Sequence, residues 1–186
     1  GFAQGLVEAG IAPGDRVAGY VPNVPEAVIA ALGSAAIGAV WSSCAPEFGV
    51  RSVIDRFSQI EPAVLVVVDG YRYGTKQIDR RQHVADIVAA LPTLRHVVHI
   101  PYLDRNVGPR GSDGVEHHTW DALLLGAPAE HLTFVPVAPD HPLYVLYSSG
   151  TTGLPKAIVH GHGGVVAEHL KVLTFHQDLT PADRFF

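Results

Sequence analysis

The sequence has 186 residues, with 13 Lys and Arg against 18 Asp and Glu, a formal net charge of −5, and one cysteine. This charge argues against a nucleic-acid partner, which requires a basic surface. A single cysteine excludes a fold held by internal disulfides and predicts a reducing, cytoplasmic compartment. Because 17% of the residues are charged and 47% are hydrophobic, we expect a folded domain rather than a disordered chain.

The apolar runs and the ends of the chain lead to two further expectations. The longest apolar run, residues 27–41, is shorter than the roughly 20 residues that cross a bilayer, so we expect no membrane span. The chain contains no Met, opens on residues typical of the middle of a helix and closes on residues typical of the start of a strand. We therefore expect an internal fragment of a longer protein.

Helical and strand patterns alternate along the first hundred residues. The Pro13-Gly14 turn ends a helix at residues 1–9. The β-branched run at residues 63–68 is the clearest strand, of the kind that helices cover on both faces. The other predicted helices are 26–37, 50–60 and 78–91, and the other predicted strands are 16–20, 39–42 and 96–100.

The second half of the chain continues the alternation with longer connections. Residues 101–116 are predicted to form a loop, and Thr119 is expected to cap a short helix at 119–125. Four prolines mark residues 126–142 as irregular and as the best candidate for a subdomain junction within one large domain. Strands at 143–147 and 157–160 and a helix at 165–175 follow. The alternation predicts an α/β fold with a largely parallel sheet and helices on both faces.

The clearest chemical pattern is the string SSGTTGLPK between the last two predicted strands. Its glycines let backbone N–H groups turn toward one point, an arrangement that binds anions. The hydroxyls add neutral donors and the lysine adds a positive charge, so the loop suits an oligophosphate. The alternative is a polar hairpin turn with a solvated lysine. The residues of the predicted site are Ser148, Ser149, Gly150, Thr151, Thr152, Gly153 and Lys156.

This string is not a Walker A loop. That motif has Gly directly before its Lys, Ser or Thr directly after it, and a helix next, whereas Pro155 and Ala157 flank Lys156 and a strand follows. A kinase or similar enzyme is therefore disfavoured. Because a hairpin between strands lacks a helix dipole, the hydroxyls and Lys156 must supply most of the attraction for an anion.

The string YSSGTTGLPK resembles the phosphate-binding signature of adenylate-forming enzymes, which include acyl-CoA synthetases, firefly luciferase and peptide-synthetase adenylation domains. GIAPGDRVAGYVPNVPEAVIAALGSAAIGAVW resembles the N-terminal strand–helix–strand unit of that family, so the resemblance covers most of the chain. WSSCAPEFGVRSVIDRFSQIEP, IVHGHGG and HQDLTPADRFF are most similar to acetoacetyl-CoA synthetases. Acetyl- and propionyl-CoA synthetases are the next choice.

The resemblance implies an AMP-forming ligase that uses ATP, Mg²⁺ and coenzyme A to activate a short-chain carboxylate, with acetoacetate favoured. The loop residues named above would hold the β- and γ-phosphates with Mg²⁺. Lys156 does not correspond to the adenylation lysine of the family, which belongs to a C-terminal domain that this chain lacks. The resemblance therefore assigns no catalytic residue to the fragment, makes the missing domain its partner, and predicts that the fragment alone is inactive.

Two basic residues in the string DGYRYGTK follow the clearest strand. Ligands of open α/β sheets gather at the carboxyl ends of strands, and the resemblance makes Arg72 and Lys76 candidates for the 3′-phosphate of coenzyme A. The alternative is that both side chains are simply solvated.

Eleven histidines and one cysteine raise the questions of a metal site and of a nucleophile. There is no H-E-x-x-H string and no cysteine cluster, so we expect no metal site. Cys44 would need a base to act as a nucleophile, and a buried structural thiol is the preferred interpretation. The histidines whose spacing comes nearest to a metal site are His160, His162, His169 and His176, with Glu168 nearby.

A different class of function stays open beside the ligase. The chain would then be a non-catalytic α/β module that binds an anion or a partner through the same loop. A lysine-bearing C-terminal domain in the longer protein would favour the enzyme, and its absence would favour the module.

Overall fold

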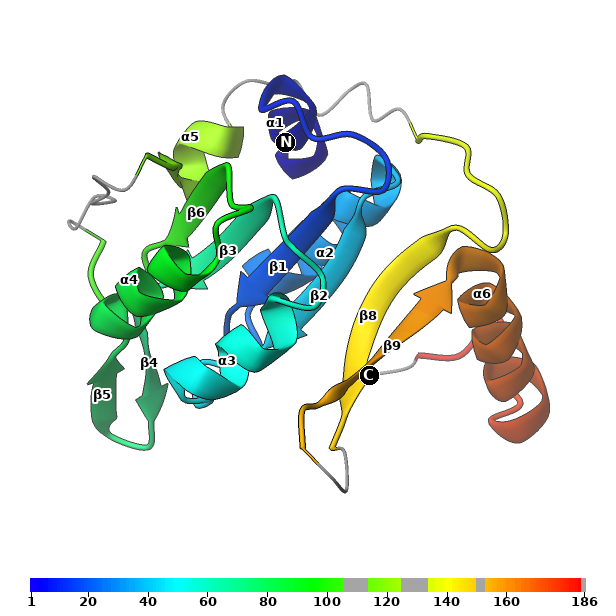
Figure 1. The fold of residues 1–186 in the computed structure, drawn as a ribbon. Helices are drawn as coiled ribbons and strands as arrows, with labels where there is room; N and C mark the ends of the chain where they lie inside the picture. Colours follow the sequence, from blue (N-terminus) through cyan, green and yellow to red (C-terminus); the bar gives the residue numbers. More distant parts are fainter. Residues whose placement is uncertain (106–113, 125–133, 150–152, 185–186) are drawn as a thin grey trace.

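The computed structural model describes residues 1–105, 114–124, 134–149 and 153–184. Its main sheet consists of β1 (Arg16–Tyr20), β2 (Val40–Cys44), β3 (Val64–Val68), β6 (His96–Ile100), β7 (Glu116–Thr119), β8 (Pro142–Ser148) and β9 (Lys156–Gly161). The strand order is β7-β6-β3-β1-β2-β8-β9 (Figure 1). All neighbours are parallel except β8 and β9, which form an antiparallel hairpin. The predicted α/β fold with a largely parallel sheet is confirmed.

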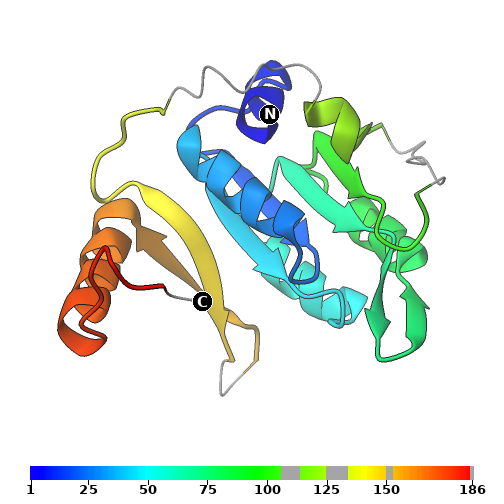
Figure 2. The same ribbon diagram turned by 180° about the vertical axis from the view of Figure 1, so that it is seen from behind.

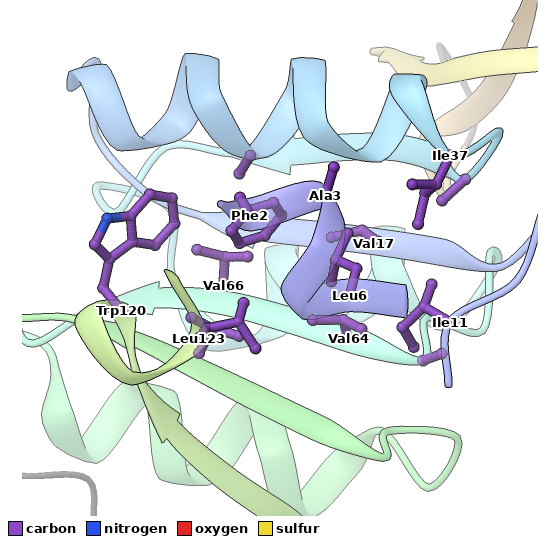
Figure 3. Packing of buried hydrophobic residues seen from close by; sticks show 14 of the residues in the cluster. Phe2, Ala3, Leu6, Ile11, Val17, Ile37, Val64, Val66, Trp120 and Leu123 are labelled. Carbon is purple, nitrogen blue, oxygen red and sulfur yellow. The ribbon is translucent and has the colours of Figure 1, made fainter. Parts of the chain in front are cut away.

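Helices cover both faces of this sheet, as Figures 1 and 2 show from opposite sides. One face packs against α1 (Phe2–Glu8), α2 (Pro25–Ala36) and α5 (Trp120–Leu124), and the other against α3 (Val50–Phe57) and α4 (Arg81–Ala90). β3 is buried along its whole length, which explains its unbroken β-branched composition. On the face covered by α1, α2 and α5, the rings of Phe2 and Trp120 stack with their centroids 5.1 Å apart (Figure 3).

Three elements differ from the sequence-based predictions. A hairpin of β4 (Gly70–Tyr73) and β5 (Lys76–Asp79) lies between the strand predicted at 63–68 and the helix predicted at 78–91, and it includes the first two residues of that predicted helix. Gly70 makes this hairpin possible, because a Cβ there would lie 2.3 Å from the carbonyl oxygen of Ile78. β7 lies at the end of the predicted loop 101–116 and pairs with β6, although its residues carry no apolar alternation. Thr119 does cap α5, since its Oγ1 accepts a 3.1 Å hydrogen bond from the amide of Ala122.

The third difference is the last helix, α6 (His162–Lys171), which begins three residues before its predicted start and continues as a π-helical turn over Val172–His176. Its first turn is fixed by the amide of Gly163, which donates a 2.7 Å hydrogen bond to the carbonyl of Pro139. A Cβ at Gly163 would lie 2.8 Å from the Pro139 side chain, so this close approach requires glycine.

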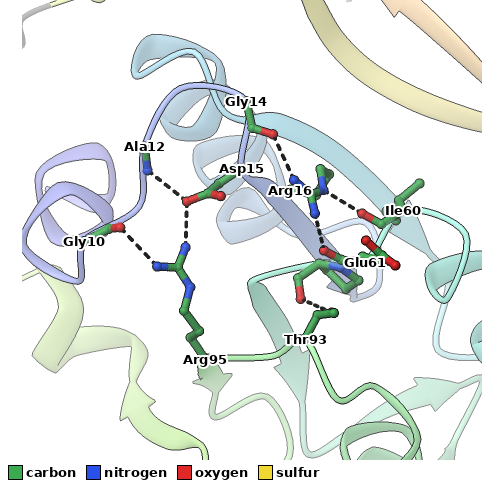
Figure 4. A network of polar contacts seen from close by, with 10 residues as sticks. Gly10, Ala12, Gly14, Asp15, Arg16, Ile60, Glu61, Thr93 and Arg95 are labelled. Atoms are coloured by element: carbon green, nitrogen blue, oxygen red, sulfur yellow. Dashed lines mark hydrogen bonds and ion pairs between the residues drawn. The ribbon is translucent and has the colours of Figure 1, made fainter.

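Two arginines tie the elements together at the amino edge of the sheet (Figure 4). Arg16 donates to the carbonyls of Ile60 and Glu61 over 2.6 and 2.7 Å. Arg95 pairs with Asp15 at 2.6 Å. The opposite, carboxyl edge carries the loops described below.

Among the described residues, no helix combines the length and the hydrophobicity needed to cross a membrane. Of the predicted junction at 126–142, residues 126–133 lie outside the described ranges, and 134–141 form neither helix nor strand. The junction stays a prediction.

Candidate functional site

The predicted phosphate loop joins the two strands of the β8–β9 hairpin. Ser148, the last residue of β8, is the register partner of Lys156, the first residue of β9. Ser148 is half-buried, whereas Ser149 and Lys156 are exposed. Gly153 has a φ of +135°, a conformation that L side chains rarely adopt. The other three residues of the predicted site, Gly150, Thr151 and Thr152, lie outside the described residues.

The hairpin places this loop at the carboxyl edge of the parallel sheet. β8 runs parallel to β2, and β3 runs parallel to β1, so the loop after β8 and the β4–β5 hairpin after β3 lie at the same edge (Figure 1). Two strands, β1 and β2, lie between them in the sheet order. With neighbouring strands about 4.8 Å apart, β3 and β8 are separated by about 14 Å. Open α/β sheets bind their ligands at this edge.

Helix α3 and the turn that directly follows it support the phosphate loop on both of its sides. On the β8 side, the Tyr147 hydroxyl donates a 2.8 Å hydrogen bond to the Arg56 carbonyl. On the β9 side, the Gln59 side-chain amide donates a 2.9 Å hydrogen bond to the Pro155 carbonyl. Burial raises the pKa of Tyr147 to about 12, so the hydroxyl stays protonated as a donor at neutral pH. One end of the loop is therefore tethered to α3 and the other to the turn directly after it.

A second tether fixes β8 to the centre of the sheet. The hydroxyl of Ser42, buried on β2, donates a 2.8 Å hydrogen bond to the Val145 carbonyl. This bond reinforces the short β2–β8 pairing, whose register joins Trp41 to Tyr144.

Residues 45–49, which follow β2, connect the phosphate loop with the β4–β5 hairpin. The Arg56 guanidinium lies 4.9 Å from the centroid of the Phe48 ring and 5.9 Å from that of the Tyr147 ring. Arg80, directly after β5, donates a 2.8 Å hydrogen bond to the Pro46 carbonyl. Its guanidinium lies 5.3 Å from the centroid of the Tyr71 ring. No local motif marks these arginines, because the aromatic rings and the Pro46 carbonyl that they contact lie in other segments of the chain.

The two predicted coenzyme A residues lie on the β4–β5 hairpin and are exposed. Arg72 is the cross-strand partner of Gln77, and Lys76 is the partner of Tyr73. Adjacent cross-strand pairs point to opposite faces of a ribbon, so Arg72 and Lys76 project to opposite sides. This placement makes one phosphate gripped by both side chains less favourable than a contact by one of them. Their role stays a prediction.

Among the described residues, Cys44 and the four histidines considered above do not come together in a metal site. Cys44 is 3% exposed, and burial raises its pKa to about 11, as the interpretation of a structural thiol requires. The ring of His160 lies 5.1 Å from that of Tyr144. His162 is the first residue of α6 rather than a loop residue, and burial lowers its pKa. The start predicted for this helix, residue 165, was wrong, because the Gly163–Pro139 contact extends the helix to include His162.

Comparisons with known proteins point to one family. A family model described as AMP-binding enzyme matches residues 1–186. The chain is 42% identical over 187 residues to an acetoacetyl-coenzyme A synthetase of Rhizobium meliloti (strain 1021), with 98% of this chain and 28% of that protein covered. An acetoacetyl-CoA synthetase of Mus musculus is 40% identical over 189 residues, with the same shares covered.

A solved structure gives the same result at the level of the fold. The acetoacetyl-CoA synthetase from Streptomyces lividans matches with a TM-score of 0.89 and 57% identity, over 100% of this chain and 27% of that one. The chain thus spans about 28% of the length of the curated relatives it matches.

Proposed function

The chain belongs to the AMP-binding enzyme family, and from this premise we propose that it forms the phosphate-binding part of an ATP-dependent ligase that joins acetoacetate to coenzyme A. The observation that carries the proposal is the position of the hairpin loop, which brings Ser148 and Lys156 together at the carboxyl edge of the sheet. Similarity to acetoacetyl-CoA synthetases favours acetoacetate as the acid.

The proposed reaction has two steps. A carboxylate oxygen of the acid attacks the α-phosphorus of ATP and forms the acyl-adenylate, while the bond between the α- and β-phosphates breaks and pyrophosphate leaves. The sulfur of coenzyme A then attacks the acyl carbon, the bond from that carbon to the phosphate oxygen breaks, AMP leaves, and the thiol proton passes to solvent. The loop acts in the first step, by holding the β- and γ-phosphates and stabilising the charge that develops on pyrophosphate.

The donor set of the loop determines what it contributes. The string SSGTTGLPK contains hydroxyls, backbone amides and one ammonium group but no carboxylate, so it supplies donors to phosphate oxygens rather than a cage for a metal. Mg²⁺ fits beside such a loop as a partner of the phosphates and would neutralise part of their charge there. Lys156 adds a positive charge at the position where β9 begins.

For the second substrate, we propose that Arg72 contacts the 3′-phosphate of coenzyme A. Its exposed position on the β4–β5 hairpin, at the same edge as the phosphate loop, supports this role. Lys76, on the opposite face of the hairpin, would contribute a more general attraction for the anionic nucleotide.

We further propose that the active enzyme includes more of the polypeptide, with the missing C-terminal domain of the family as the partner of this chain. The β8–β9 hairpin, α6 and the π-helical turn after α6 expose many large apolar side chains, and Phe175 in that turn is 81% exposed. Apolar surface of this kind is typical of a face that packs against more protein. The 186-residue chain alone is expected to be inactive and to bind a hydrophobic dye more strongly than the full-length protein does. The exposed residues are Leu146, Leu154, Ile158, Val159, Val166, Leu170 and Phe175.

The proposed function is tested by acid-dependent exchange of labelled pyrophosphate into ATP, measured with the full-length protein. We expect exchange with acetoacetate that exceeds exchange with acetate or propionate at equal concentration. Faster exchange with acetate or propionate than with acetoacetate would indicate that the faster acid is the substrate. No exchange with any short carboxylate would favour the non-catalytic anion-binding module.

A further inference from the structure

An unusual concentration of histidines lies on the neighbouring strands β6 and β7. β6 reads HVVHI and β7 reads EHHT, and the register pairs His96 with Glu116 and Val98 with His118. Because side chains at positions i and i+2 of a strand share a face, Glu116 and His118 lie on the same face of β7. His96 points to this face as well, since its ring nitrogen contacts both of them. His117 points to the opposite face, where its ring pairs with that of His99.

The three side chains on the first face bring their ligand atoms together. Nδ1 of His96 lies 3.1 Å from Nε2 of His118 and 3.5 Å from Oε2 of Glu116. The third edge of the triangle, from Nε2 of His118 to Oε2 of Glu116, measures 3.8 Å. Four-coordinate zinc with ligands at about 2.05 Å requires about 3.3 Å between ligand atoms. The three distances bracket this value, so a zinc ion fits with small side-chain movements.

The surroundings of the three residues favour a metal over a purely ionic cluster. His96 is 7% exposed and anchors the group at the edge of the core, whereas the Glu116 side chain is 73% exposed and leaves a path to solvent. The neighbouring cation, Arg95, is already paired with Asp15 and with the Gly10 carbonyl (Figure 4). Burial lowers the pKa of His96, and the neutral imidazole is the form that binds a metal.

We propose that His96, Glu116 and His118 form a zinc site in which two imidazole nitrogens and one carboxylate oxygen bind the ion and solvent takes the fourth position. Binding would break the hydrogen bond between the two rings, and the ring that donates it would carry its proton on its other nitrogen, so that both imidazoles stay neutral. The ion would link β7, the edge strand of the sheet, to the buried strand β6, and so act as a structural clamp distant from the phosphate loop. The order of the strands supports this distance, since β3, β1 and β2 lie between β6 and β8.

The proposal is tested by titrating the metal-free full-length protein with Zn²⁺ by calorimetry and with Co²⁺ by visible absorption. We expect uptake of one ion, an absorption spectrum typical of tetrahedral Co²⁺, and a rise in the melting temperature with Zn²⁺. The variants His118→Asn and Glu116→Gln remove one ligand each at partly or well exposed positions. Each should weaken zinc binding by more than about tenfold, a loss that even outer-shell partners cause.

A matched control separates this site from general binding by histidines. His117→Asn changes the adjacent residue of the same strand, whose ring faces the other side of the sheet, and should leave zinc affinity and the cobalt spectrum unchanged. Circular dichroism of each variant checks that the fold persists. Absence of zinc uptake, equal affinity in His118→Asn and the unmodified protein, or an equal loss in His117→Asn would overturn the proposal.

Discussion

The Tyr147 hydroxyl donates a 2.8 Å hydrogen bond to the main-chain carbonyl of Arg56, across 91 residues of sequence. This bond joins the last turn of α3 to the strand that leads into the phosphate loop. The Arg56 side chain lies over the ring of the same tyrosine, so the two residues contact each other twice. These two contacts fix the position of the end of β8 relative to α3, and therefore the position of Ser148, where the loop begins.

Replacing Tyr147 by Phe removes this hydrogen bond while keeping the ring. The free energy of unfolding should fall by about 1 kcal/mol, because the Arg56 carbonyl loses the Tyr147 hydroxyl and keeps only the amide of Gln59 as a donor. In the full-length protein the apparent KM for ATP should rise, since the end of β8 is held less firmly. Urea unfolding and steady-state kinetics measure the two effects. Tyr73→Phe, at a site 72% exposed, is the control and should change neither value; equal effects in both variants would argue against the tether.

We expect a side chain at Gly153 to be unfavourable because of the backbone conformation and not because of a steric clash. A Cβ there would meet nothing within 4 Å, but φ is +135°. Gly153→Ala should therefore strain the loop by about 1–3 kcal/mol and slow the adenylation step. Gly49→Ala is the matched control, because a Cβ at Gly49 also meets nothing within 4 Å and its φ is −70°. Equal pyrophosphate exchange in the two variants would contradict the strained-loop interpretation.

Cys44 should resist alkylation in the folded protein. Burial raises its pKa from 9.0 to about 11, so at pH 8 the thiolate fraction falls about 100-fold. Because the folded pKa lies above the unfolded one, the stability linked to the neutral thiol is full below pH 9 and is lost as the pH rises toward 11. Mass spectrometry of the peptide that contains Cys44 measures the alkylation rate of the folded protein in buffer and of the unfolded protein in urea. Similar alkylation rates in the two conditions would show that the thiol is accessible in the folded protein.

Much of the fold follows from local sequence patterns. The run at residues 63–68 predicts a strand buried on both faces, and β3 is buried throughout. The alternation of helices and strands predicts the parallel sheet, and the signature YSSGTTGLPK identifies the family that the comparisons confirm. These features are predictable because the periodicity of apolar residues and the composition of turns are encoded within a few neighbouring residues.

The parts that local patterns miss depend on contacts between distant segments. β7 has a polar sequence and exists through its pairing with β6. The β4–β5 hairpin depends on the absence of a side chain at Gly70, next to the Ile78 carbonyl. Likewise, Arg56 and Arg80 acquire their roles from aromatic rings and carbonyls that only the folded chain brings near. The loop of the candidate site could be proposed from its own residues, whereas the side chains that hold it in place could not.

Reversing the charge of Arg72 tests the proposed coenzyme A contact separately from adenylation. Arg72→Glu in the full-length protein should raise the apparent KM for coenzyme A, because a carboxylate would repel the 3′-phosphate. Pyrophosphate exchange, which does not involve coenzyme A, should stay unchanged. Arg51→Glu makes the same charge change at an exposed side chain of α3 and serves as the control. An apparent KM for coenzyme A that is unchanged in Arg72→Glu would contradict the proposal that Arg72 contacts coenzyme A.

The central claim, that the β8–β9 loop holds the phosphates of ATP during adenylation, is tested most directly by the pyrophosphate exchange rate of Lys156→Ala. Loss of this positive charge should reduce acetoacetate-dependent exchange by about 100- to 1,000-fold, the order of effect seen when one preorganised group that stabilises developing charge is removed. Lys171→Ala, which removes an exposed lysine paired with Glu168 on α6, should exchange at the unmodified rate. Exchange in Lys156→Ala equal to that in Lys171→Ala would contradict the claim.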